Sequence, residues 1–165
     1  MSYYTLLDSP VGKLRLTSDG QALTGLDMLN AEDDLNPGKD WIEKDDLELF
    51  QSTKKQLKEY FAGKRRDFDL PCFMEGTEFS RRVWKELTRI PYGTTISYGE
   101  LARRLGNDKA SRAVGLANGR NPIGIIVPCH RVIGANGTLT GYGGGLERKR
   151  MLLDLEQRND NQTKS

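Results

Sequence analysis

One short run constrains this chain more than any other. It is Pro128-Cys129-His130-Arg131-Val132, which contains the only histidine and one of the two cysteines of the chain. An apolar stretch, Ile123 to Val127, precedes the run, and glycines are frequent soon after it. A short apolar stretch bounded by turn residues is typical of a buried strand. We therefore expect Cys129 to lie at the end of a buried strand, facing a tight loop.

The pair Cys129 and His130 is a candidate nucleophile and base. A thiol becomes a nucleophile when it loses its proton, and histidine is the side chain that titrates near neutral pH. Adjacent side chains on a strand point to opposite faces, so the two groups need a turn or a bridging water to exchange a proton. Taken without its surroundings, the run is equally compatible with a buried structural cysteine.

Composition narrows the class of protein. The chain has 165 residues, of which 36% are hydrophobic, and no apolar run approaches the roughly 20 residues that span a bilayer. This pattern predicts a globular protein without a membrane segment, and the first residues lack a signal-peptide pattern. Two cysteines favour free thiols in a reducing compartment, so we expect a cytoplasmic protein. One histidine and two cysteines are too few for a four-ligand zinc site, so we expect no metal.

The first half of the chain has the pattern of a small sheet followed by a helix. Apolar and polar residues alternate over 3–29, with turn residues between the runs, which predicts short strands. Residues 30–40 are typical of a loop, and the apolar spacing over 46–62 predicts an amphipathic helix. Residues 64–72 fit a strand or a linker, with Cys72 as a packed structural thiol. We place a domain boundary near residue 75.

The second half is predicted to be mostly helical. Thr77 is a candidate cap for one helix, and Ser97 with Glu100 fits a capping box at the start of another. A third, short helix is expected over 109–118, and the last two of these three form a helix-turn-helix pattern. That pattern alone is weak, because many helical hairpins bind nothing. The glycines between 134 and 141 suggest a small hairpin or wing.

The third of these helices is rich in small residues, and two interpretations remain open. Small side chains let a helix approach either a neighbouring helix or a narrow groove closely, with Arg112 and Arg120 near phosphates or bases in the second case. The net charge is only +2, although basic residues gather in the second half. That distribution suits a polyanion, while a solvated surface of mixed charge is the simpler alternative. A last helix is expected over 147–158, where Lys149 and Arg150 are solvated or face phosphate.

These features together resemble the O6-alkylguanine-DNA alkyltransferases, also called methylated-DNA–protein-cysteine methyltransferases. Four segments match that family in order and spacing: Asn121-Pro122, Ile125 to Val132, Gly141 to Gly145, and Leu152-Leu153 with Glu156. The likeness covers residues 79–156, while the first half matches only loosely. It implies an α/β (α+β) fold with a ribonuclease H-like sheet and helix domain over 1–75. A mostly helical domain of the winged helix-turn-helix type follows over 76–158, and 159–165 is expected to be a polar tail.

The resemblance implies an activity. It is the repair of double-stranded DNA by direct, irreversible transfer of an alkyl group from O6-alkylguanine to Cys129, one lesion for each molecule. It also implies a monomer without cofactor or metal that works in the cytoplasm at the nucleoid, or in the nucleus of a eukaryote. Acceptance of O4-alkylthymine is left open. Two alternatives are a non-catalytic module that binds alkyl lesions and a Cys-His hydrolase of small esters or peptides.

The resemblance also implies residue roles. Cys129 is the acceptor, His130 and Glu156 form a relay to it through a water, and Asn121 supports the active-site turn. Tyr98 protonates the guanine leaving group, and Arg112 fills the gap left by the flipped base. The implied DNA-binding set is Tyr98, Arg112, Ala113, Gly115 and Arg120, on a helix that enters the minor groove. The implied walls of the base pocket are Val132, Tyr142, Gly143 and Gly144.

Overall fold

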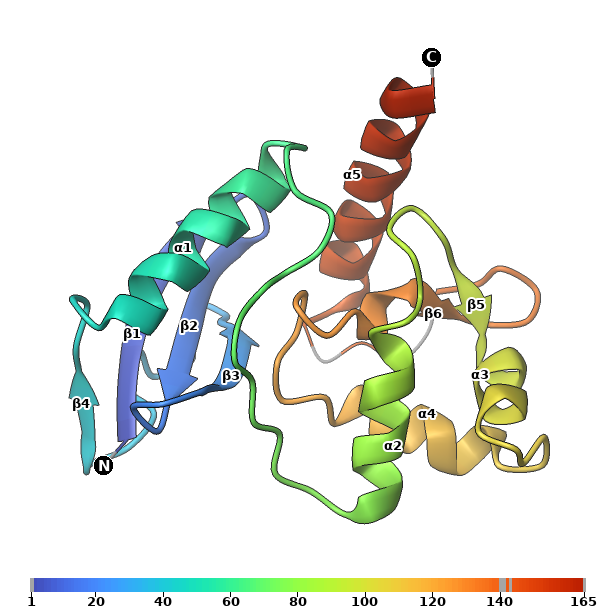
Figure 1. Cartoon of the computed structure of the whole chain (residues 1–165), viewed down its shortest axis with the longest axis horizontal. Helices are drawn as coiled ribbons and strands as arrows, with labels where there is room; N and C mark the ends of the chain where they lie inside the picture. Colours follow the sequence, from blue (N-terminus) through green and yellow to red (C-terminus); the bar gives the residue numbers. More distant parts are fainter. Residues whose placement is uncertain (1, 140–141, 143, 165) are drawn as a thin grey trace. The chain divides into compact units, whose positions relative to one another are not determined.

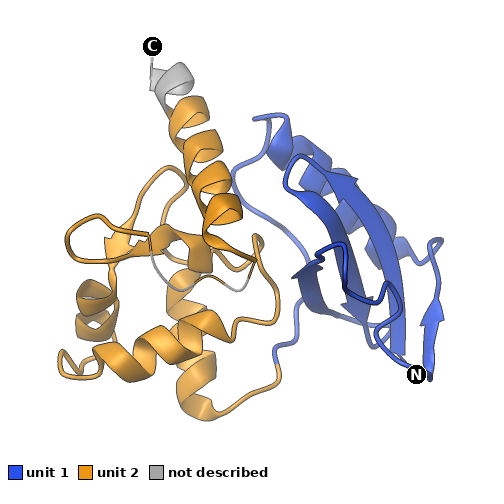
Figure 2. Ribbon diagram, turned by 180° about the vertical axis from the view of Figure 1, so that it is seen from behind, with its two compact units in different colours: residues 1–74 blue, residues 75–165 orange. Residues whose placement is uncertain are grey.

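The computed structural model of this chain describes residues 2–139, 142 and 144–164, with side chains described up to residue 160. The chain divides into two compact units, Met1–Met74 and Glu75–Ser165 (Figure 2). The first unit is a sheet with one helix, and the second is mostly helical. The α+β class expected from the sequence is confirmed.

The sheet of the first unit has the strand order β3-β2-β1-β4. Strands β1 (Ser2–Ser9), β2 (Gly12–Ser18) and β3 (Leu23–Met28) form an antiparallel meander, which confirms the strands predicted from alternation. Strand β4 (Trp41–Glu43) pairs in parallel with β1. The sequence did not predict β4, because three residues are too few to establish an alternating pattern.

Helix α1 (Glu48–Phe61) lies across the sheet (Figure 1). Its inward side chains Phe50, Leu57 and Tyr60 are fully buried, which anchors the helix to the sheet. Gly63 follows the C-cap Ala62, and its φ of 78° is a left-handed conformation that glycine adopts without strain. Cys72 lies beyond this helix and is exposed, so its prediction as a packed structural thiol was wrong.

Helices α2 (Glu78–Leu87) and α3 (Tyr98–Arg104) of the second unit begin where their caps predict. The Thr77 hydroxyl accepts a hydrogen bond from the Ser80 amide at 3.1 Å, and the Ser97 hydroxyl accepts one from the Glu100 amide at 3.0 Å. These bonds satisfy amide groups that the first turn of a helix leaves without partners. Residue identity thus fixes both helix starts.

Helix α4 (Ser111–Gly119) follows α3 after a turn at Gly106, whose φ is 83°. The two helices form the expected helix-turn-helix, and α4 also packs against α2 (Figure 1). The indole of Trp84 on α2 donates a hydrogen bond of 2.9 Å to the Ala117 carbonyl. This bond joins α2 to α4 within the buried core of the unit.

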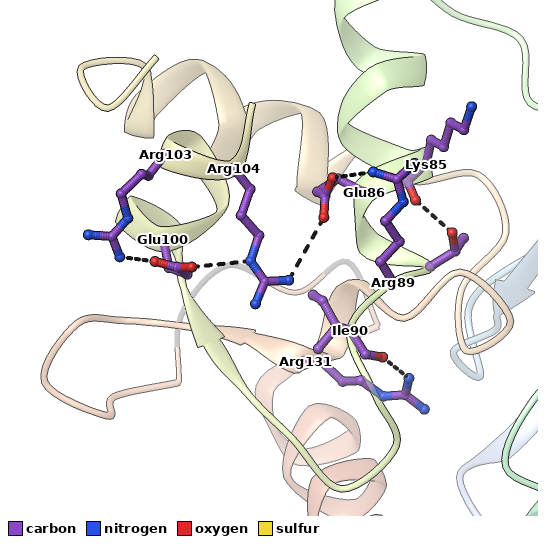
Figure 3. A network of polar contacts seen from close by, with 9 residues as sticks. Lys85, Glu86, Arg89, Ile90, Glu100, Arg103, Arg104 and Arg131 are labelled. Carbon is purple, nitrogen blue, oxygen red and sulfur yellow. Dashed lines mark hydrogen bonds and ion pairs between the residues drawn. The ribbon is translucent and has the colours of Figure 1, made fainter. Parts of the chain in front are cut away.

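Ion pairs join α2 to α3 (Figure 3). Glu86 on α2 accepts a hydrogen bond from Arg89 at 3.0 Å and lies 3.8 Å from Arg104 on α3. Arg104 also donates to Glu100 at 3.2 Å, and Arg103 pairs with the same carboxylate. Arg104 therefore bridges two carboxylates, one on each helix.

A two-stranded parallel sheet positions the start of α3. Strand β5 (Ile96–Ser97) pairs with β6 (Val132–Ile133), so the residue that follows β5, Tyr98, is held close to the Pro-Cys-His-Arg run. Residues 134–139 form a turn closed by a 2.8 Å bond from the Gly134 amide to the Thr138 carbonyl, without a strand among them. Gly141, the last glycine of the expected wing, lies outside the described residues.

The final helix, α5, spans Leu146–Lys164 and is longer than the 147–158 expected from the sequence. The polar residues after 158 continue the helix rather than forming the separate tail that we expected. The loss of apolar spacing therefore does not by itself end a helix. Helix α5 packs against Cys129–Arg131, the centre of the Pro-Cys-His-Arg run.

Candidate active site around Cys129

The segment before Cys129 is a series of turns, so the predicted buried strand was wrong. The Val127 amide donates to the Ile123 carbonyl at 3.0 Å, and the Ile126 amide donates to the Gly124 carbonyl at 2.8 Å. Ile125 has a φ of 70°, a rare conformation for a β-branched residue, and it is buried. The apolar side chains are buried as predicted, but the backbone that carries them folds back on itself.

Cys129, His130 and Arg131 form a single 3-10 turn, η1. Because the turn rotates the chain by about a third of a circle for each residue, the three side chains point in three directions. This arrangement replaces the opposite faces that a strand would give Cys129 and His130. All three residues are buried.

Asn121 ties the two ends of the preceding turn together. Its side-chain amide donates to the Val127 carbonyl at 2.7 Å, and its side-chain oxygen accepts from the Ile123 amide at 3.0 Å. The position of Cys129 therefore depends on one asparagine, as well as on the strained backbone of Ile125. Strain of this kind costs about 1–3 kcal/mol and persists only where the surroundings hold it.

His130 and Arg131 both bind the carboxylate of Glu156 on α5. His130 Nε2 lies 2.7 Å from Glu156 Oε2, and Arg131 donates to both oxygens, at 2.8 Å to Oε1 and 3.0 Å to Oε2. The third nitrogen of Arg131 donates to the Ile90 carbonyl at 2.7 Å, shown in Figure 3. Glu156 is thus positioned by two neighbours in sequence.

The triad of His130, Arg131 and Glu156 contains one negative, one positive and one neutral group at rest. Burial alone would raise the pKa of Glu156, but the contacts with His130 and Arg131 outweigh burial and hold that pKa far below its usual range. Burial lowers the pKa of His130, helped by the positive charges of Arg131 and Lys149 and opposed by Glu156. The resting triad therefore contains an anionic carboxylate, a cationic guanidinium and a neutral imidazole.

The Cys129 thiol is protonated at rest. Cys129 is only 7% exposed, and this burial raises the pKa of its thiol. The Asn121 side chain and the positive charge of Lys149 act in the opposite direction and favour the thiolate. The site holds the means to stabilise an anionic sulfur, although the neutral form is preferred before a substrate arrives.

Lys149 is a site residue that the sequence analysis missed. We expected it to be solvated or to face phosphate, but it is fully buried. Its ammonium group lies 6.0 Å from the centre of the Tyr98 ring and interacts electrostatically with Cys129. Burial lowers the pKa of Lys149, while Cys129 raises it. The sequence does contain a signal: Lys149, Leu152 and Glu156 have the spacing of one helix face, and all three are buried.

Two buried polar atoms near Cys129 lack partners among the described residues. One is Nδ1 of His130, the nitrogen on the side of the ring away from Glu156, and the other is Oδ1 of Asn118. The other end of the Asn118 amide donates to the Cys129 carbonyl at 3.3 Å. Buried nitrogen and oxygen atoms normally bond to a protein group or an ordered water. The free nitrogen of His130 therefore offers a binding position for a water or a thiol.

Three of the five predicted DNA-binding residues lie on one exposed face of α4 and its C-terminal cap. Arg112, Ala113 and Arg120 are exposed there, and neither guanidinium bonds to another residue within the described part of the chain. Gly115 faces inward instead: a methyl group on it would lie 3.6 Å from the half-buried Tyr98 ring. The small residues are thus compatible with both interpretations, close packing on a neighbouring helix and entry into a narrow groove. Gly115 makes room for Tyr98, and Ala113 is a small side chain on the exposed face.

The structure places three of the four predicted pocket residues. Val132 is buried in β6, paired with Ile96. Tyr142 is close enough to Cys129 for electrostatic interaction, and burial raises the pKa of its phenol well above the ordinary value. The Gly144 carbonyl lies 3.5 Å from the Arg148 guanidinium. Gly143 lies outside the described residues.

The part of the chain that the structure describes contains no cluster of three or more His, Cys, Asp or Glu side chains suited to a metal ion. Among the described helices, none combines the length and the apolar character needed to cross a membrane.

Comparison with family models decides which family this chain resembles. Residues 78–158 match the model "6-O-methylguanine DNA methyltransferase, DNA binding domain", and residues 2–72 match "6-O-methylguanine DNA methyltransferase, ribonuclease-like domain". The chain belongs to the O6-methylguanine-DNA methyltransferase family. The family suggested by the Pro-Cys-His-Arg run and its flanking segments is therefore confirmed, and the matched ranges cover both compact units.

Individual methyltransferases are similar over almost the whole chain. The methylated-DNA–protein-cysteine methyltransferase of Methanosarcina acetivorans is 50% identical over 154 residues, which are 93% of this chain and 97% of that protein. The protein of the same name from Mycobacterium tuberculosis is 53% identical over 158 residues, or 95% and 93% of the two chains. A crystal structure of Mycobacterium tuberculosis OGT in complex with DNA matches with a TM-score of 0.87 at 51% identity, covering 95% of this chain and 94% of that one.

Proposed function

We propose that this protein repairs DNA by moving the alkyl group of O6-alkylguanine onto the sulfur of Cys129. The observation that carries the proposal is the 2.7 Å contact between His130 and Glu156, next to a buried thiol in a methyltransferase of known family. The sulfur attacks the carbon bound to guanine O6, so the S–C bond forms as the C–O bond breaks. The product is a thioether, which no group of the site cleaves, and each molecule therefore acts once.

The proton of the thiol leaves through His130. Its Nδ1 is buried and has no partner among the described residues, which supports a bridging water between this atom and Cys129. Nε2 of the same ring contacts Glu156, whose negative charge stabilises the imidazolium that forms. Because Arg131 also binds this carboxylate, Glu156 stays anionic and does not itself take the proton.

The leaving guanine gains negative charge as the C–O bond breaks, and we assign its protonation to Tyr98. The pairing of β5 with β6 holds Tyr98 close to the Pro-Cys-His-Arg run, and the buried Lys149 ammonium lies 6.0 Å from the centre of its ring. The same cation favours the Cys129 thiolate. In total, the thiol proton ends on guanine after passing through His130, solvent and Tyr98, and no cofactor is consumed.

The DNA partner is a duplex bound in its minor groove by α4. The exposed face of that helix carries Arg112 and Arg120, and Ala113 and Gly119 on the same face are small enough for a narrow groove. The damaged nucleotide must leave the base stack to reach Cys129, which costs a few kcal/mol. Arg112 offsets part of this cost by entering the gap. We expect a monomer that works where the DNA is, in the cytoplasm at the nucleoid.

Intact-mass measurement after incubation with a duplex that contains O6-methylguanine tests the proposal. We expect each protein molecule to gain one methylene unit, located on Cys129 by peptide mapping, and we expect Cys129→Ser to gain nothing. Cys72→Ser is the matched control, because it removes the other thiol and is expected to react normally. Binding without a mass gain indicates the lesion-binding module, and turnover of acyl esters indicates the hydrolase.

A further inference from the structure

Leu116 is the most exposed large apolar side chain in the described part of the chain, at 56%. It lies on α4, whose opposite face is the buried one that carries Val114 and Ala117. Leu116 is therefore directed outward by the geometry of the helix. Its exposed companions on the same face are Arg112, Ala113, Gly119 and Arg120.

Leu116 is the one large apolar side chain that the described residues place on this exposed face, and the residues one turn away on either side are small. Ala113 lies one turn before it, and Gly119 lies one turn after it and has no side chain. A methyl group built on Gly119 would find no atom within 4 Å, so the surface beside Leu116 is open. A leucine in such a place contributes little to the core, and the exposure of its apolar surface to water is unfavourable unless a partner covers it.

The charge on this face indicates a polyanion as that partner. Arg112 and Arg120 lie at opposite ends of the face, and neither forms an ion pair with the described residues. Two free guanidinium groups beside one leucine suit the phosphates and sugars that line a DNA groove. A second copy of this chain would instead bring the same two positive charges against their own copies.

We propose that Leu116 is a wedge that enters the minor groove next to the lesion and assists extrusion of the damaged base. This inference rests on the proposed function. Leu116 lies four residues after Arg112, which is about 6 Å along the helix, or close to two base-pair steps of about 3.4 Å each. When Arg112 fills the gap, Leu116 therefore contacts the neighbouring steps. Apolar side chains at such positions partly unstack the steps that they enter, which makes a neighbouring base easier to remove.

The test compares Leu116→Ala with two substrates, a duplex containing O6-methylguanine and free O6-benzylguanine. We expect the rate constant for the duplex to fall about tenfold, the ratio that follows from losing most of the buried apolar surface of one leucine. We expect the free base to react at the unchanged rate, because no base stack has to open. Leu35→Ala, which truncates another exposed leucine in the other unit, is expected to leave both rates unchanged.

Two further variants separate a wedge from general affinity. Leu116→Met keeps an apolar side chain of similar reach and is expected to restore most of the rate for the duplex. Leu116→Lys adds a phosphate-binding charge and is expected to bind undamaged DNA more tightly, yet to repair the lesion slowly. Recovery of the repair rate by lysine would overturn the inference.

Three further results would overturn either the wedge or the proposed function. An unchanged duplex rate in Leu116→Ala overturns the wedge and leaves the proposed function standing. A wild-type protein that gains no alkyl group from either substrate overturns the proposed function instead. If sedimentation shows that the wild-type protein dimerises at assay concentrations and Leu116→Ala does not, the side chain belongs to an interface between copies, which also overturns the wedge.

Discussion

Arg131 and Glu156 form a buried, two-pronged ion pair, with Arg131 Nε 2.8 Å from Glu156 Oε1 and Nη2 3.0 Å from Oε2. The carboxylate that serves His130 is therefore neutralised in advance by the next residue of the chain. Burial, aided by the positive charge of Arg131, lowers the pKa of His130, so His130 is neutral at rest and becomes a cation when it accepts the proton of Cys129. Breaking the ion pair should affect both folding and chemistry.

Arg131→Met tests the ion pair. Removal of one partner leaves Glu156 as an unbalanced buried charge, and we expect a loss of about 3–5 kcal/mol in unfolding free energy, measured by urea denaturation. The double variant Arg131→Met with Glu156→Gln removes both charges and should regain part of that loss. A double variant no more stable than Arg131→Met would contradict this account.

The pH dependence of stability tests the neutral state of His130. Its pKa in the folded protein is below the ordinary value of 6.5, so the unfolded chain binds more protons just below that pH. Stability should therefore rise with pH up to about 6.5 and then level off, and this rise should be absent in His130→Gln. Since His130 is the only histidine, its imidazole NMR signal gives an independent measurement. A signal that titrates at or above pH 6.5 would show that the assignment is wrong.

Lys149→Met tests the buried cation. Without its charge, the Cys129 thiolate is less favoured, so we expect the repair rate at pH 7 to fall at least about tenfold and the rising limb of the pH–rate curve to move to higher pH. The ultraviolet absorbance of the thiolate should show the same displacement. Lys85→Met removes an exposed lysine and serves as the control. A slower reaction with an unmoved pH curve would assign Lys149 a purely structural role.

Asn121→Ala tests the turn that positions Cys129. Two hydrogen bonds to the backbone are lost, and we expect a cost of about 1–3 kcal/mol in unfolding free energy. Asn121→Asp keeps the acceptor for the Ile123 amide but loses the donor to Val127 and places a negative charge beside the sulfur. It should be more stable than Asn121→Ala and still react slowly. Equal stability of the two variants would argue against this division of roles.

Arg112→Ala tests the replacement of the flipped base. We expect the rate with duplex DNA to fall by about tenfold or more, since the cost of flipping is a few kcal/mol, and we expect the reaction with the free modified base to be unaffected. Arg120→Ala is the matched control on the same face and should weaken DNA binding mainly at low salt, with a shallower salt dependence. Equal losses on both substrates would exclude the gap-filling role.

Local rules predicted much of this fold from the sequence. The side-chain oxygens of Thr77 and Ser97 mark the first turns of α2 and α3, and the structure confirms both positions. The strand predicted for the apolar stretch before Cys129 was wrong, because a run of apolar residues indicates burial but does not determine the backbone conformation. A β-branched residue such as Ile125 favours a strand by propensity, and only the tertiary packing holds it at a φ of 70°.

The sequence predicted the reactive residues of the site better than the contacts that position them. The sequence favoured Cys129 and His130 because their side chains are reactive, whereas Arg131 and Asn118 became visible only through their contacts in the structure. Lys149 was missed because a charged residue on a helix is usually solvated. Lys149 lies on the same buried helix face as Leu152 and Glu156. A charged residue within an apolar face of a helix can therefore indicate a buried functional site.

The burial of Cys129 has a consequence for the lifetime of the protein before it meets damage. A sulfur that is mostly protonated reacts slowly with peroxides and stray electrophiles, which attack thiolates. Under the proposed chemistry each molecule uses its one acceptor sulfur once, so oxidation of that sulfur beyond the sulfenic acid would end its repair capacity as completely as repair does. The exposed Cys72 is open to such reagents, and it can be consumed without loss of the repair capacity held inside.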